Sequence, residues 1–79
     1  MWFVVLVFSV NDPKFGRVKR TIHWDATVGN WDGFTATPYR SREEAEAVAV
    51  FLAPAILCLP NPAELAVVDM NEIYTYYWP

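Results

Sequence analysis

Two side chains of this sequence have a chemistry suited to catalysis: His23, the only histidine, and Cys58, the only cysteine. His23 lies two positions before Asp25, so on a β-strand the two side chains share a face, with the spacing of an acid/base pair. Covalent catalysis would also need a nucleophile beside the base. Ser9, Ser41 and Cys58 fall in other predicted elements, with nothing in the sequence to bring them to His23. We therefore interpret His23 as an exposed histidine on a polar strand face and predict no enzymatic activity.

The spacing of the polar residues does not match a known pattern for binding a metal or a cofactor. Cys58 stands in an apolar run with no adjoining Lys or Arg to activate it, so we predict a structural thiol in the core. One histidine, one cysteine and scattered acids do not give the spacing of a metal-ligand set. Gly29 and Gly33 lie four positions apart, but no Lys-Ser/Thr pair follows them as in a phosphate-binding loop. We expect no metal and no cofactor.

The first half of the chain predicts strands. Residues 2–10 are β-branched and aromatic with little alternation, which is typical of a strand covered on both faces. Residues 17–25 alternate, with Val18, Ile22 and Trp24 on a core face that Arg20 interrupts. The other face of that strand collects the polar side chains of Arg17, Lys19, Thr21, His23 and Asp25. Turn residues follow, and we predict a third short strand over residues 33–39.

A helix is predicted over residues 41–53. Ser41 and Glu44 have the spacing of a capping box, in which each side chain reaches the other's backbone N–H. Ala45, Val48, Phe51 and Leu52 then recur at helical spacing and predict the buried stripe. Pro54 is expected to end the helix at the residue before it.

The sequence after the helix is compatible with two secondary structures. Residues 66–68 and 73–78 favour strands, whereas Asn61 could cap a helix that begins at Pro62. We favour the strands. The expected fold is therefore α+β, with an antiparallel sheet of four to five strands and one main helix packed on one face, in two layers. We expect a single domain spanning residues 1–79.

Length and composition set the class of protein. A chain of 79 residues that is 54% hydrophobic and 16% aromatic is too apolar to be disordered, and one cysteine cannot form an internal disulfide. The apolar first ten residues lack the basic start and small-residue cleavage site of a signal peptide, and the run is too short to cross a membrane. We expect a cytoplasmic protein without a membrane partner, in the host cell if it is encoded by a phage.

The charge distribution is the most informative feature for function. All six basic residues fall within residues 14–42, whereas the chain from Glu43 onward has six acids and no base. Such asymmetry predicts an acidic, aromatic surface for a protein partner with a basic surface; simple solvation of the fold explains the acids equally well. The expected partner-binding residues are Glu43, Glu46, Asp69, Glu72, Trp31 and Tyr77.

Two other functions remain open. Single-stranded nucleic acid needs cations for its phosphates and rings for its bases. Trp24 and Trp31 lie near four such cations, although Trp24 falls on the core face. The nucleic-acid alternative uses Lys14, Arg17, Lys19 and Arg20. A structural homo-oligomer, such as a homodimer, would explain four aromatic side chains within residues 74–79, since self-association can cover surplus aromatic surface.

In size and charge the chain resembles small phage-encoded inhibitors, of which the anti-CRISPR proteins are an example. The features that carry the resemblance are the capped Ala- and Glu-rich helix over residues 41–53, the acidic half after Glu43 and the lack of catalytic residues. The resemblance implies stoichiometric binding to a host defence or nucleic-acid-handling complex. The six basic residues depart from the pattern of a pure DNA mimic.

Overall fold

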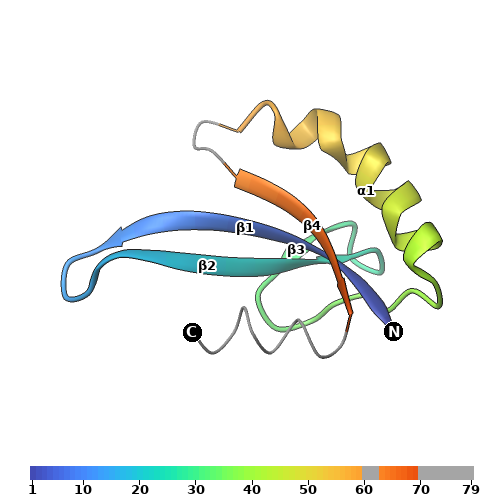
Figure 1. Ribbon diagram of the computed structural model, residues 1–79, viewed down its shortest axis with the longest axis horizontal. Coiled ribbons are helices and arrows are strands. Elements are labelled where there is room, and N and C mark those ends of the chain that lie inside the picture. Colours follow the sequence, from blue (N-terminus) through green and yellow to red (C-terminus); the bar gives the residue numbers. More distant parts are fainter. Residues whose placement is uncertain (60–62, 70–79) are drawn as a thin grey trace.

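The computed structural model describes residues 1–59 and 63–69 and confirms a small α+β fold (Figure 1). Four antiparallel strands form one open sheet in the order β3-β2-β1-β4, and one helix packs on it against β1 and β4. The elements in chain order are β1 (Trp2–Asp12), β2 (Gly16–Asp25), β3 (Asn30–Asp32), α1 (Arg42–Ile56) and β4 (Ala63–Asp69).

Strand β1 lies at the centre of the sheet, between β2 and β4. Its residues 4–7 are all buried, which confirms the expectation of a strand covered on both faces. Val4 belongs to the core beneath α1, whereas Val5 and Val7 belong to a second cluster on the opposite face. We call these the helix face and the far face of the sheet.

The core of the helix face is closed by α1. Val4, Ala45 and Leu52 are buried together, and Trp24 packs against them as its place in the alternation predicts. The other partly buried residues of this core are Trp2, Trp31, Tyr39, Val48, Ala49, Leu65 and Val67.

The far face corrects the interpretation of His23. His23 pairs with Val5 across the β1–β2 ladder, and its side chain is only 1% exposed instead of lying on a solvated polar face. Asp25 is buried at the end of the same strand. The alternation placed both residues on the same side of β2, but the expectation that this side of the strand is exposed at His23 was wrong.

Helix α1 begins as predicted. Ser41 is the N-cap in extended conformation, and its Oγ accepts the backbone N–H of Glu44 at 3.2 Å. Glu44 Oε2 reaches back to accept the N–H of Arg40 at 3.2 Å, one residue further than in a standard capping box. The side chains of Ser41 and Glu44 therefore fix the start of the helix by capping it.

Three expectations about the end of the helix were wrong. The helix continues through Pro54 to Ile56. Pro54 is on the exposed side, where solvent can hydrogen-bond the Val50 carbonyl that proline leaves without its helical donor. Phe51 points to solvent and not into the buried stripe, and Cys58 is exposed, with its Sγ 3.5 Å from the Pro54 carbonyl oxygen.

The predicted third strand over residues 33–39 is also wrong, since β3 comprises only Asn30–Asp32 before it. The segment is instead held by hydrogen bonds to the end of β2. Thr35 Oγ1 donates to Asp25 Oδ2 at 2.6 Å, and the Thr37 N–H donates to the Trp24 carbonyl at 3.0 Å. Pro38 has no N–H to donate to a ladder, and only Tyr39 pairs with β1, through Trp2.

Strand β4 settles, for residues 63–69, whether the chain after α1 forms a strand or a helix. The strand expected at residues 66–68 is confirmed and runs over Ala63–Asp69, so a helix continuing through these residues from Pro62 is wrong. The strand expected at residues 73–78 lies outside the described residues. The described part of the chain contains no helix with the length and hydrophobicity to cross a lipid bilayer.

Candidate functional site

The solvent side of α1 carries an apolar surface that the sequence reasoning missed. Residues spaced by three, four and seven positions share one side of a helix, and here those positions are exposed and mostly apolar. We call this surface the outer face of α1; it consists of Glu43, Ala47, Val50, Phe51, Pro54 and Leu57.

Three large side chains dominate the outer face. Val50, Phe51 and Leu57 are 75%, 82% and 86% exposed. A surface helix of a globular protein normally pairs an apolar stripe toward the core with a polar stripe toward water, and a helix that is apolar all round is normally buried. A signal for this surface was present in the sequence, because residues 47–59 contain no charged side chain on any side of the helix.

The acids at the start of α1 are not equivalent. Glu46 is paired with Arg42, with Oε1 2.7 Å from Nε, and Glu44 accepts the Arg40 backbone N–H. Glu43 makes no such contact within residues 1–59 and 63–69 and is exposed on the outer face. Of the two predicted helix acids, Glu43 therefore presents an uncompensated charge beside the apolar surface, and Glu46 does not.

Of the two remaining predicted acids, Asp69 lies within the described residues. Asp69 ends β4, half-buried and paired with Trp2, whose ring lies under the Arg42 guanidinium at 5.5 Å. This places Asp69 at the same end of the sheet as the first turn of α1. Glu72 and Tyr77 lie outside the described residues.

Trp31 is not the freely exposed ring that was expected. It packs against the helix-face core, and its ring meets that of Trp24 edge to face, with centroids 5.6 Å apart. It stands on β3, at the opposite edge of the sheet from Asp69 on β4. The structure therefore separates Trp31 from Asp69 but places it against the same core as α1.

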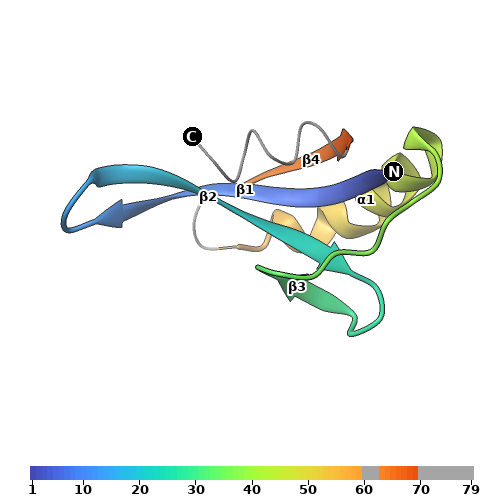
Figure 2. The same ribbon diagram turned by 90° about the horizontal axis from the view of Figure 1, so that it is seen from below.

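Four of the six basic residues gather at one end of the molecule. Lys14, Arg17, Lys19 and Arg20 lie around the β1–β2 turn, and Figures 1 and 2 show this turn at the opposite end from the first turn of α1. Trp24 lies near the other end of β2, about 27 Å from Gly16 along the strand, and Trp31 pairs with it from β3. The structure thus does not bring the expected tryptophans to the basic residues.

His23 and Asp25 are engaged in the structure. The His23 Nδ1 atom lies 3.3 Å from the Asp32 carbonyl oxygen, and burial lowers the pKa of the imidazole below its usual value. The Thr35 hydroxyl and the backbone N–H of Thr27 hold the Asp25 carboxylate and lower its pKa. Because the His23 side chain is only 1% exposed, its imidazole is not accessible to a substrate in the way that an acid/base role requires.

Neither a search for metal-ligand groups nor comparison with known proteins identifies a further candidate site in the described residues. Within residues 1–59 and 63–69, no three His, Cys, Asp or Glu side chains are grouped so as to hold a metal ion. No family model, no curated protein and no solved structure matches this chain. The likeness to small phage-encoded inhibitors therefore stays a prediction.

Proposed function

We propose that this protein is a small, non-enzymatic protein-binding module that inserts the outer face of α1 into an apolar groove of its partner. The observation that carries the proposal is the exposure of Val50, Phe51 and Leu57 on one side of one helix. An amphipathic helix placed in a groove, with anchors at i, i+4 and i+7, is a recurrent mode of protein recognition.

Charge favours a partner with a basic surface over a second copy of this chain. Glu43 lies on the outer face, and no basic residue lies in the last turn of α1 to oppose it in a paired copy. A basic side chain at the rim of the partner's groove would meet Glu43 and orient the helix. The apolar side chains would then contribute most of the binding energy.

The resemblance in size and charge suggests what kind of module this is: a stoichiometric inhibitor of a host defence or nucleic-acid-handling complex. The proposed setting is the cytoplasm, of the host cell if the protein is phage-encoded. An exposed lone thiol such as Cys58 fits a reducing compartment, where it is not driven to form disulfides between copies.

The test compares capture of the partner by matched variants. The double variant Phe51→Ser/Leu57→Ser removes two outer-face anchors, and Phe34→Ser removes an equally exposed phenylalanine from the loop before α1. We expect wild type and Phe34→Ser to retain one stoichiometric protein from a nuclease-treated lysate of the source cell. The double variant should lose it, because truncating an anchor costs about 2 kcal/mol or more. Capture that is unchanged in the double variant would refute docking through α1.

Two further measurements separate the roles of charge and self-association. Glu43→Lys should weaken capture, whereas Glu46→Lys should have a smaller effect because Glu46 is already paired with Arg42. Equal effects would mean that the acids act only through net charge. Sedimentation of the purified protein should show a monomer; a dimer that the Phe51→Ser/Leu57→Ser variant dissociates would assign the outer face to a homo-oligomer instead.

A further inference from the structure

The turn between β1 and β2 ends a two-stranded projection. Pairing of β4 with β1 stops at Phe8 and Ala63, and pairing of β3 with β2 begins only at His23. Between these limits no third strand joins the ladder within the described part of the chain. We call residues 8–20 the hairpin arm; Figure 2 shows it extending away from α1 and β3.

The hairpin arm carries four cations and one acid. The acid, Asp12, accepts the backbone N–H groups of Lys14 and Phe15 at 2.7 and 3.0 Å, which lower its pKa and shape the turn. Arg20 lies 3.9 Å from the same carboxylate. Arg17 and Lys19 have no carboxylate within 4.0 Å among residues 1–59 and 63–69. Against the described part of the chain, the arm therefore presents positive charge that no carboxylate pairs with at Arg17 and Lys19.

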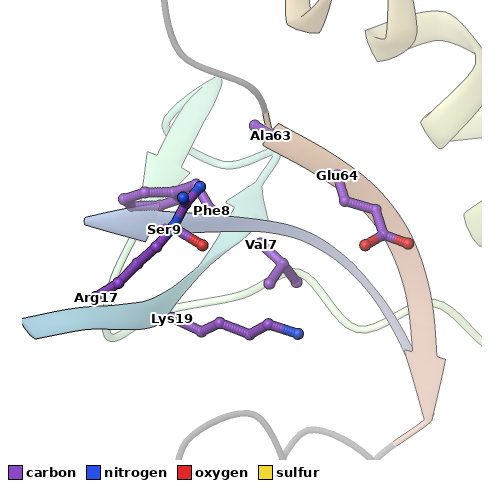
Figure 3. Close-up of a pocket in the computed structure, with 7 residues that line it drawn as sticks. All are labelled: Val7, Phe8, Ser9, Arg17, Lys19, Ala63 and Glu64. Atoms are coloured by element: carbon purple, nitrogen blue, oxygen red, sulfur yellow. The ribbon is translucent and has the colours of Figure 1, made fainter. Parts of the chain in front are cut away.

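Arg17 and Lys19 border a pocket on the far face of the sheet. They stand two positions apart on β2, so their side chains leave the same face, and Lys19 pairs directly with Ser9 on β1. The pocket has a volume of about 260 Å³, with its described lining from β1, β2 and β4 (Figure 3). Its lining residues in the described part of the chain are Val7, Phe8, Ser9, Arg17, Lys19, Ala63 and Glu64.

Charge is unevenly distributed around this pocket. Arg17, Lys19 and the Ser9 hydroxyl provide hydrogen-bond donors on the β1–β2 side, and Glu64 provides a carboxylate on the β4 side. Arg17 and Lys19 therefore attract an anion and Glu64 repels it, and Figure 3 shows the Arg17 guanidinium beside Phe8 and Ser9 with the Lys19 ammonium extending away from it. A guanidinium and an ammonium beside a hydroxyl suit the oxygens of a phosphate group.

An aromatic ring stands at the tip of the same arm. Phe15 is 72% exposed in the turn, and the Lys14 Nζ atom lies 5.4 Å from its ring centroid. Unpaired bases stack on such rings with little regard to sequence, whereas a duplex keeps its base faces covered. An exposed ring next to unpaired cations is the combination that single-stranded nucleic acid requires.

We propose that the hairpin arm binds single-stranded nucleic acid. One backbone phosphate lies near the Arg17 guanidinium and the Ser9 hydroxyl, a second lies near Lys19 and a third near Lys14, and a base stacks on Phe15. This surface is distinct from the outer face of α1, so it does not depend on the proposed protein-binding function. It keeps the cations expected from the sequence and replaces Trp31 with Phe15 as the stacking ring.

The probe is a fluorescently labelled oligothymidylate of about 15 nucleotides, whose anisotropy is measured against the full-length protein at several salt concentrations. Three phosphate contacts, by Lys14, Arg17 and Lys19, predict that the logarithm of affinity falls with the logarithm of salt with a slope of about −2. Arg17→Gln and Lys19→Gln should each reduce the magnitude of this slope by about 0.7, whereas Arg40→Gln, an exposed arginine outside the arm, should leave it unchanged.

Two further variants test the ring and the repelling acid. Phe15→Ala should weaken binding about tenfold, and Phe34→Ala, an exposed phenylalanine in the loop after β3, should not change it. Glu64→Gln should tighten binding, because it removes the carboxylate from the pocket. Circular dichroism confirms that each variant is folded.

Three results would overturn the proposal. The first is the absence of binding at low salt. The second is equal or tighter binding of a duplex of the same length, which would leave no role for stacking on Phe15. The third is binding that Arg17→Gln, Lys19→Gln and Arg40→Gln weaken equally, since this would show attraction to the whole protein and not to the arm.

Discussion

The rings of Trp24 and Trp31 meet edge to face, with centroids 5.6 Å apart and planes at 67°, across the short β2–β3 ladder. Both rings pack against the core beneath α1. Because β3 has only three residues, this contact gives the edge strand an attachment to the core that its few ladder hydrogen bonds would not provide alone.

Trp31→Leu is expected to lower the free energy of unfolding by about 1 kcal/mol, since an aromatic pair contributes roughly that much beyond its buried area. Urea denaturation followed by circular dichroism measures the change. Phe34→Leu, at a side chain that is 98% exposed, is the control and should be neutral. A Trp31→Leu variant of unchanged stability that no longer captures the protein partner would return Trp31 to the binding surface originally expected for it.

His23 predicts a dependence of stability on pH near neutrality. Burial lowers the pKa of its imidazole in the folded protein below the value of about 6.5 in the unfolded chain, so the unfolded chain binds more protons below that value. Stability should be fully present above pH 6.5 and should fall as the pH drops below it. Urea midpoints at pH 7.5 and 5.0 measure this loss.

His23→Gln separates this effect from the carboxylates. Asp25 and Asp32 have pKa values lowered by hydrogen bonds, from the Thr35 hydroxyl and from the Phe34 N–H respectively, so their contribution is lost only below pH 3.8. The variant should therefore lose less stability than wild type between pH 7.5 and 5.0. An equal loss in both proteins would assign the pH dependence to other groups.

Leu52 and Phe51 are sequence neighbours in α1 that differ in burial, at 8% and 82% exposed. Leu52 is buried in the helix-face core, so Leu52→Ala should cost about 2–5 kcal/mol of stability through lost contacts and a cavity. Phe51→Ala should change stability by no more than about 0.5 kcal/mol, because its side chain is in solvent. Chemical denaturation of the two variants checks the orientation of the helix, and the reverse ranking would show that it is rotated.

Ser41 tests the start of the helix. Ser41→Ala removes the acceptor of the Glu44 N–H and should cost about 1 kcal/mol of stability. Ser41→Asp keeps an acceptor at the cap and should preserve stability. If both variants lose stability alike, the role of Ser41 is in packing and not in capping.

The local features of this fold were predictable from the sequence. The Ser41 cap, the alternation along residues 17–25 and the unbroken apolar run in residues 2–10 each depend on neighbouring residues, and the structure confirms the elements they predict. The clustering of cations around residues 14–20 was also visible, since a hairpin turn brings sequence neighbours together.

The tertiary structure alone decided which surfaces are buried. Periodicity places His23 on one side of β2 and Phe51 on one side of α1, but it does not say whether that side meets another part of the protein or water. Here the far face of the sheet is buried around His23, and the side of α1 that carries Phe51 is left in solvent. Burial depends on contacts between segments distant in sequence, such as β1 with β4 and both with α1, and these contacts leave Phe51 in solvent where the sequence pattern suggested core.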